Sequence, residues 1–381
     1  MINFRNWSYP TDITLGQGSL KLLPEACHST GISKPLVVTD KGLEDYQIIH
    51  RCLEVLRKNG FSAKLFSNVD PNPNQANLAG GITDFLSLGA DGIVAIGGGS
   101  ALDLGKLIAF MAVQQKSVWE FEDFGDLWKK AESEGICPII ALPTTAGTGS
   151  EVGRAGVLTD TRSKTKKVIF HPKMLPTKVI ADPDLTYSLP PPLVAGTGMD
   201  AFAHCLEAYC SPAFHPMSQG IALEGLRLVK ENLLNAFEDK ENLEARENML
   251  CAAMMGAVAF QKGLGAIHSI SHPIGSLYGK HHGTTNAVVM PFVLELNRQA
   301  IEDKIISITN YLEISGGFEG FLEYVLDLRS SLSIPENLTA FGVPGDNLTT
   351  MVEMALKDPT AGGNPVPLNF ENVMELYKSC F

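Results

Sequence analysis

One carboxylate and three imidazoles in the second half of the chain have the residue types of a divalent-metal site. Asp200 and His204 are four residues apart, so a helix places both side chains on one face. His268 and His272 repeat this spacing, and a further histidine follows at a turn. A mixed set of carboxylate and imidazoles suits Fe(II), Zn(II), Mn(II), Co(II) or Ni(II). The candidate ligands are Asp200, His204, His268 and His282.

A glycine-rich loop in the first half has the character of a phosphate-binding turn. Gly97-Gly98-Gly99-Ser100 directly follows an apolar run that ends at Ile96. Glycines allow the backbone to approach a ligand closely, and free N–H groups at the start of the next helix would bind a pyrophosphate. We expect Ser100 to cap that helix, with Asp103 as the carboxylate of a capping box. The loop is not a G-x-G-x-x-G motif, and a structural tight turn is the alternative.

Two further polar positions follow apolar runs that we expect to be parallel strands. Asp40 follows Leu36–Thr39, where a carboxylate could bind a ribose diol and repel a 2′-phosphate. The alternative for Asp40 is an N-cap of the next helix. The stretch Pro143–Glu151 is rich in threonine and glycine. Because ligands bind at the carboxyl ends of parallel strands, both positions are candidates for dinucleotide binding.

Short apolar runs alternate with amphipathic segments up to about residue 188. This alternation is typical of parallel β-α-β units. The expected strands are 35–40, 91–96, 137–142 and 177–182, and the expected helices are about 43–58, 74–88 and 100–115.

After the three prolines at 190–192 the pattern changes to long helical segments. These are expected at about 191–212, 215–237, 243–262, 265–277, 284–301 and 319–332. The segment from Ile334 onwards is richer in Pro, Gly and Asn, and we expect it to be partly loop. The sequence therefore predicts an α/β domain over residues 1–188 and an all-helical domain over 189–381.

Composition narrows the class of function. The 381 residues, 45% of them hydrophobic, can bury a large core in about two domains. A net charge of −12 argues against nucleic-acid binding. No signal-peptide pattern, no membrane-spanning run and no C-x-x-C pair among seven cysteines is evident. We therefore expect a cytoplasmic protein that binds neither nucleic acid nor membrane.

Several motifs together resemble the iron-containing (group III) alcohol dehydrogenases. GGGSALDLGK, LPTTAGTGSEV, ADPDL, TGMDAFAHCLEAY and HHGTTNAVVMP occur in that order. The resemblance extends from TDITLGQGSL to LKDPTAGGNPVPL, over nearly the whole chain. It implies a Rossmann-like dinucleotide-binding domain followed by an all-α metal-binding domain, the fold shared with dehydroquinate synthase, with the active site in a cleft between them. It also implies NAD, Fe(II) or another divalent metal such as Zn(II), and a homodimer.

The resemblance assigns roles to individual residues. The metal ligands map onto the four residues named above, although His281 stands where the family often has proline and competes with His282. Cofactor contacts map onto Asp40, Asn72, Gly98, Gly99, Ser100, Thr144, Thr145, Thr148 and Lys166, and Lys167 is a rival for the last position. His272 matches a family histidine that lies near the nicotinamide and is not a ligand. We interpret His272 as a proton relay through water or the ribose hydroxyl; the alternative is a histidine that only orients a neighbour.

These assignments predict a metal-dependent, NAD(H)-linked alcohol dehydrogenase that interconverts an alcohol and its aldehyde or ketone. The metal would bind the alcohol or carbonyl oxygen. Asp40 makes NADP the less favoured cofactor. Alternatives on the same fold are a glycerol dehydrogenase-like enzyme and a dehydroquinate synthase-like enzyme, although the latter needs a basic phosphate pocket and the helical half has few clustered Lys or Arg. A metal- or nucleotide-binding protein without turnover is a third possibility.

Overall fold

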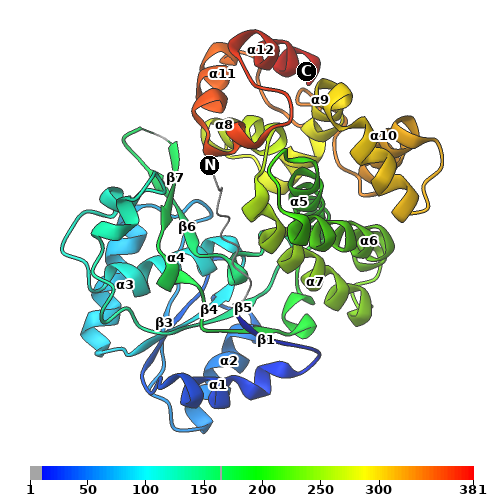
Figure 1. Cartoon of the computed structure of the whole chain (residues 1–381). Coiled ribbons are helices and arrows are strands. Elements are labelled where there is room, and N and C mark those ends of the chain that lie inside the picture. Colours follow the sequence, from blue (N-terminus) through cyan, green and yellow to red (C-terminus); the bar gives the residue numbers. More distant parts are fainter. Residues whose placement is uncertain (1–10, 164) are drawn as a thin grey trace. The chain divides into compact units, whose positions relative to one another are not determined.

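The computed structural model describes residues 11–163 and 165–381. They divide into two compact units, which are described separately (Figure 1). The first comprises the residues up to Thr145 together with Gly149–Tyr187, and the second comprises Ala146–Thr148 together with Ser188–Phe381. A parallel sheet with helices followed by a helical unit confirms the predicted fold class.

A six-stranded sheet forms the centre of the first unit. Its strand order is β1-β8-β5-β4-β2-β3, and every neighbouring pair is parallel. The strands are β1 (Asp12–Leu15), β2 (Pro35–Val38), β3 (Lys64–Phe66), β4 (Gly92–Gly97), β5 (Ile139–Pro143) and β8 (Lys178–Ala181). The predictions of β2, β4, β5 and β8 are confirmed. Apart from the half-buried Lys178 of β8, their residues are buried, as central parallel strands require.

Helices pack on the sheet and bury its strands. The side chains of α1 (Leu23–Thr30) and α2 (Gln47–Lys58) form one core with alternate residues of the central strands. The helix α4 (Gly99–Met111) contacts β4, β5 and β2, and α3 (Gln75–Leu88) contacts α4. An antiparallel hairpin of β6 (Ala155–Asp160) and β7 (Thr165–Phe170) packs on α4.

The order of strands reverses between β2 and β4. From β2 the chain proceeds outwards to β3, and it then returns to place β4 and β5 on the other side of β2. Val38 pairs with Ala95, and Gly97 pairs with Pro143. The residues that follow these three strands therefore lie along one edge of the sheet, at the switch point where open α/β sheets bind ligands.

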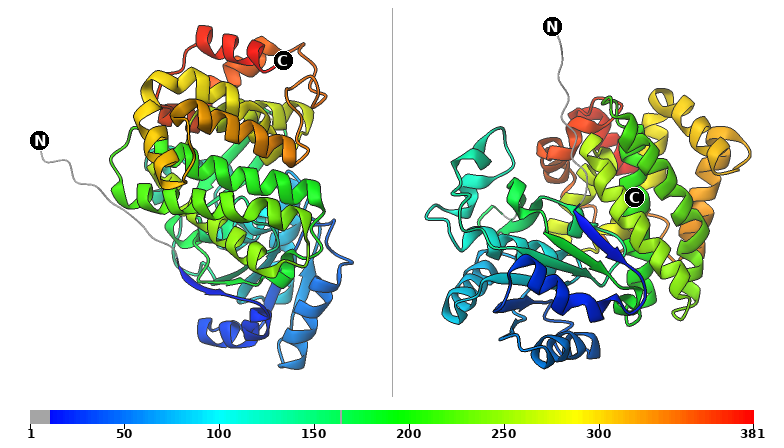
Figure 2. Two further views of the ribbon diagram at one scale, coloured as in Figure 1. Left: turned by 90° about the vertical axis from the view of Figure 1, so that its right-hand side faces the viewer. Right: turned by 60° about the horizontal axis from the view of Figure 1, so that its bottom comes forward.

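The second unit is helical throughout (Figure 2). The helices are α5 (Pro191–Cys210), α6 (Pro216–Glu238), α7 (Leu243–Ala259), α8 (Ala266–Tyr278), α9 (His282–Tyr311), α10 (Gly317–Ser331), α11 (Leu348–Lys357) and α12 (Phe370–Ser379). Its central helix is α5, which is buried along most of its length and contacts α6, α7 and α9. The six predicted helices are confirmed, whereas α11 and α12 lie in the segment expected to be partly loop.

None of the described helices is by itself long and apolar enough to cross a membrane; only α7 with its extension to Lys262 and α8, bent by 109° between them, meet that test as a pair. All seven cysteines are free thiols.

Candidate functional site

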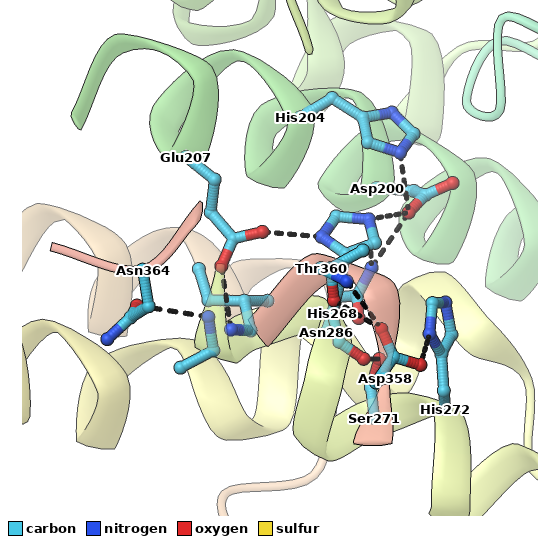
Figure 3. Close-up of polar contacts among 12 residues, drawn as sticks. Asp200, His204, Glu207, His268, Ser271, His272, Asn286, Asp358, Thr360 and Asn364 are labelled. Atoms are coloured by element: carbon cyan, nitrogen blue, oxygen red, sulfur yellow. Dashed lines mark hydrogen bonds and ion pairs between the residues drawn. The ribbon is translucent and has the colours of Figure 1, made fainter. Parts of the chain in front are cut away.

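The four predicted metal ligands come together in the second unit, and Figure 3 shows three of them, Asp200, His204 and His268. Asp200 and His204 lie one turn apart on α5, His268 lies on α8, and His282 is the first residue of α9. The Oδ1 atom of Asp200 lies 3.8 Å from His204 Nε2, 3.7 Å from His268 Nε2 and 3.4 Å from His282 Nε2. One carboxylate oxygen thus faces three imidazole nitrogens.

These distances fit one cation. Metal–ligand bonds of about 2.1 Å separate the atoms of a tetrahedral set by about 3.4 Å. The ligand atoms of Asp200, His204 and His268 all lie within 4.8 Å of one another, and the three side chains are buried. Nitrogen and oxygen donors of this kind suit Fe(II) and Zn(II) alike.

A close contact between the α5 and α9 backbones brings His282 to Asp200. A Cβ atom at Gly283 would lie 2.0 Å from the Gly196 carbonyl oxygen and 2.9 Å from the Asp200 Cβ. Only glycine permits this approach. The residue after His282 is therefore part of how the ligand set is assembled.

The geometry favours His282 over His281 as the fourth ligand. The His281 ring caps α9: its Nδ1 accepts a hydrogen bond from Thr284 N at 3.3 Å and lies 3.0 Å from Thr284 Oγ1. His282 instead directs its Nε2 towards Asp200.

Three polar side chains that the sequence analysis did not single out contact the histidines or Asp200. Glu207 Oε2 lies 2.6 Å from His268 Nδ1 (Figure 3), while its Oε1 accepts a hydrogen bond from the backbone of α8. Asn286 Nδ2 donates to Asp200 Oδ1 at 2.8 Å. Asp358 Oδ2 lies 2.7 Å from Nδ1 of His272. The Glu207 contact directs His268 Nε2 towards the ligand cluster, an arrangement common in metal sites.

The environment pushes the pKa values of neighbouring ligands apart. Burial alone would raise the pKa of Asp200, but attraction to His204, His282 and His268 outweighs burial and holds the pKa well below its usual range. Burial lowers the pKa of His204 to about 4 despite the pull of Asp200. Burial also opposes the charged form of His268, but Glu207 and Asp200 outweigh it and raise this pKa to about 10. Because a metal ligand must offer a lone pair, cation binding at His268 would displace a proton.

His272 adjoins the ligand cluster without facing Asp200. Its ring stacks on His282 with 5.1 Å between centroids and meets the His268 ring at 5.9 Å, nearly edge-on. Asp358 holds its Nδ1, and Asp358 is itself fixed by the N–H and hydroxyl of Thr360. With Nδ1 occupied, Nε2 is the ring nitrogen left for proton exchange.

The glycine loop begins α4 differently from our prediction. The N-cap is Gly98, without a side-chain hydrogen bond, so the prediction that Ser100 caps this helix is wrong. Ser100 lies inside the first turn and donates its hydroxyl to the Pro71 carbonyl at 2.8 Å. Asp103 accepts from Ser150 Oγ and from a β6 N–H, so it does not close a capping box either. Starting the helix on glycine leaves its first N–H groups without a side-chain acceptor among the described residues.

Asp40 contacts the glycine loop directly. Its Oδ2 accepts a hydrogen bond from Gly98 N at 3.1 Å, and a Cβ at Gly97, whose φ is +154°, would lie 2.5 Å from the same oxygen. The alternative role as an N-cap is wrong, because Tyr46 precedes the first residue of α2. Burial raises the pKa of Asp40 to about 6, against the opposing effect of the Gly98 N–H.

Two threonines of the Pro143–Glu151 stretch flank the glycine loop. Thr144 donates its N–H to the Gly97 carbonyl at 3.0 Å. Thr145 lies beside Gly98, where a Cβ would be 3.4 Å from its Cγ2. Thr148, in contrast, belongs to the second unit.

The two remaining predicted cofactor residues lie in neighbouring segments of the first unit. Asn72 is exposed in a loop whose Pro73 carbonyl accepts from Thr159 N at 2.7 Å. Lys166 pairs with Thr159 across the β6–β7 hairpin. Its rival Lys167 forms an ion pair with Glu122 at 3.0 Å.

Comparison with known proteins extends over the whole chain. The family model for iron-containing alcohol dehydrogenase matches residues 10–183, and the model for the C-terminal part of the Fe-containing alcohol dehydrogenase family matches residues 194–381. A 4-hydroxybutyrate dehydrogenase of Cupriavidus necator is 38% identical over 375 residues, covering 94% of both chains.

Two solved structures are similar over the same extent. A 1,3-propanediol oxidoreductase is 34% identical with a TM-score of 0.94, covering 99% of this chain and 100% of that one. A sulfoacetaldehyde reductase of Bifidobacterium kashiwanohense, solved in complex with NAD+, is 26% identical with a TM-score of 0.90, covering 99% of both chains.

Proposed function

We propose a cofactor, a substrate class and a set of working residues for this chain, which belongs to the iron-containing alcohol dehydrogenase family. As a member of that family it is an alcohol dehydrogenase, an oxidoreductase that interconverts an alcohol and its carbonyl compound. We propose a short primary alcohol as substrate, since the relatives are named for 4-hydroxybutyrate, 1,3-propanediol and sulfoacetaldehyde. The observation that carries the proposal is the convergence of three imidazole nitrogens on Asp200 Oδ1.

The proposed metal ligands are Asp200, His204, His268 and His282, and Fe(II) is the proposed cation. A divalent cation bound by them would acidify an alcohol O–H and, in the reverse direction, polarise the carbonyl oxygen. Glu207 supports this role because it holds His268 Nδ1 and so presents Nε2. Asp200, His204 and His268 are buried, whereas the His282 side chain is 29% exposed.

The proposed cofactor is NAD, which would accept the hydride. Gly99 and Ser100 would bind its pyrophosphate through their N–H groups at the start of α4, and Gly98, whose own N–H donates to Asp40, would let the pyrophosphate approach the backbone closely. Asp40 would accept hydrogen bonds from the adenine ribose and repel a 2′-phosphate. The proposed set is completed by Asn72, Thr144, Thr145, Thr148 and Lys166.

His272 is the proposed proton carrier. Asp358 holds Nδ1, so Nε2 would receive the alcohol proton through water or a ribose hydroxyl and release it to solvent. The side chain of His272 is 28% exposed, whereas that of His268 is 2% exposed. This difference supports exchange with solvent at His272.

We also propose that residues 1–188 act as the dinucleotide-binding domain and 189–381 as the catalytic domain. A homodimer in the cytoplasm is the proposed form of the protein. Sedimentation of the purified chain tests the oligomeric state.

Reduction of NAD tests the proposed function. The purified protein is loaded anaerobically with Fe(II) or Zn(II) and mixed with NAD and ethanol, 1-propanol, 1,3-propanediol or 4-hydroxybutyrate. We expect the absorbance of NADH to rise for at least one of them, and an Asp200→Ala variant to show no increase. An inactive protein across alcohols and aldehydes, with metal and NAD both bound, would contradict the proposal.

A further inference from the structure

Asn286 is a fully buried amide at the centre of the ligand cluster. It lies on α9 four residues after His282, so both side chains leave the same face of the helix. Its Nδ2 lies 2.8 Å from Asp200 Oδ1, 3.4 Å from His268 Nε2 and 3.3 Å from His282 Nε2. A single amide nitrogen thus reaches three of the four proposed ligand atoms.

The other end of this amide has no evident structural purpose. Asn286 Oδ1 is buried and has no hydrogen-bond partner among the described residues. Buried polar atoms are normally paired, and an unpaired one destabilises the fold. The described polar contacts of this amide are therefore all made by its nitrogen, at the ligand cluster.

The nitrogen acts on the oxygen that faces all three imidazoles. A carboxylate can bind a cation through one oxygen or through both, and it rotates unless something holds it. The Asn286 N–H donates to Oδ1 of Asp200, which is the atom 3.4–3.8 Å from the three Nε2 atoms. The neutral amide carries no lone pair on nitrogen that would compete with the histidines for a cation.

We propose that Asn286 is a positioning residue of the metal centre, which holds the Asp200 carboxylate so that Oδ1 alone faces the cation. This inference rests on the proposed metal site and deepens it. The side chain acts through Asp200 and is not itself a ligand.

Co(II) binding and the visible spectrum of the Co(II) protein test the proposal. The variant Asn286→Leu keeps the approximate shape and removes the N–H donor. Thr285→Val is the matched control, because Thr285 is equally buried on α9 and bonds the His281 carbonyl. Asn286→Ser, a smaller substitution, serves if the leucine variant does not fold.

We expect Asn286→Leu to weaken Co(II) binding and so raise the Kd by about 10–100-fold. The Co(II) absorption bands should also change, because Asp200 is then free to bind through both oxygens. Thr285→Val should retain the Kd and spectrum of the unchanged protein. A variant at position 286 with an unchanged Co(II) Kd and spectrum would overturn the inference. Absorption bands showing that the Co(II) ion has lost one ligand would also overturn it, since Asn286 would then be a ligand. Failure of the unchanged protein to bind Co(II) would instead overturn the proposed metal site.

Discussion

Replacing Glu207 with glutamine should weaken metal binding beyond what its effect on stability explains. The Glu207 carboxylate makes two contacts with α8: Oε2 lies 2.6 Å from His268 Nδ1, and Oε1 accepts from Ile267 N at 2.7 Å. Glutamine retains an oxygen for the backbone N–H and loses the charge beside the imidazole. The ligand basicity of His268 and the orientation of its ring depend on that charge.

The expected magnitudes follow from these two contacts. Loss of a carboxylate behind a metal-binding histidine typically weakens metal affinity about 10–100-fold, or about 1.4–2.7 kcal/mol. The bond to Ile267 N changes from charge-assisted to neutral, which should lower the free energy of unfolding of the metal-free protein by about 1 kcal/mol. Loss of the attraction between Glu207 and a protonated His268 should lower it further. Chelator competition measures the first quantity, and urea unfolding measures the second.

Asn364→Ala is the matched control for this experiment. Asn364 Oδ1 accepts from Ala266 N at 3.0 Å, the N–H next to that of Ile267, and also pairs with Asn297. Removing it should also destabilise the protein, by about 1–3 kcal/mol, because it leaves buried groups unpaired. Its metal affinity should stay within about twofold of the unchanged protein. Equal losses of affinity in both variants would refute the reasoning, since the effect would then follow stability and not the imidazole contact.

Three further substitutions test the proposed roles of Asp40 and His272 and the effect of burying Glu151. Asp40→Ser should lower the ratio of kcat/KM with NAD to kcat/KM with NADP at least tenfold, which corresponds to about 1.4 kcal/mol. Both values are measured at pH 8, above the pKa of about 6 of the Asp40 carboxyl. An unchanged ratio would contradict the proposed role of Asp40. His272→Gln should lower kcat for alcohol oxidation by about 10²–10⁴-fold while the Co(II) Kd is retained, and an unchanged kcat and pH profile would exclude the relay. Burial raises the pKa of Glu151 from 4.5 to about 7, so its contribution to stability is present below pH 4.5 and is lost as the pH rises through 7. Relative to Glu151→Gln, the unchanged protein should lose up to about 3 kcal/mol of unfolding free energy across that interval, and parallel pH profiles in urea unfolding would argue against it.

The main strands and helices could be predicted because each has a strong local signal. The buried strands are continuous apolar runs, such as Ile139–Pro143. The strands β1 and β3 could not be predicted in this way, since Asp12–Leu15 and Lys64–Phe66 are short and only partly buried. The hairpin β6–β7 carries charged residues and depends on packing against α4, which no local pattern reveals.

Local patterns were less reliable for the start of α4. Ser100 and Asp103 have the spacing of a capping box, and propensity alone favours that prediction. The helix instead begins at Gly99, and both side chains bind distant segments, Pro71 and Ser150. Tertiary contacts thus prevailed over capping propensity. The Gly98 N–H donates to Asp40, while the N–H groups of Gly99 and Ser100 have no side-chain acceptor among the described residues.

The sequence could indicate Glu207 and Asn286 but not Asp358 or Asn364. Glu207 follows Asp200 by seven residues on one helix, so the period of α5 places both on the same face. Asp358 and Asn364 reach α8 from 86 and 98 residues away in the sequence, and no periodicity connects them to it.

The beginning of α8 nevertheless contains a usable signal. Gly265 occupies its N-cap position and has no side chain to accept the first N–H groups, so acceptors must come from elsewhere. They come from Asn364 and Glu207, which bind the N–H groups of Ala266 and Ile267. Because the second oxygen of Glu207 then contacts His268, the residue that completes the helix also orients the proposed ligand. A helix that begins on glycine just before a candidate ligand therefore predicts a distant carboxylate or amide that both accepts the first N–H groups of the helix and orients the ligand.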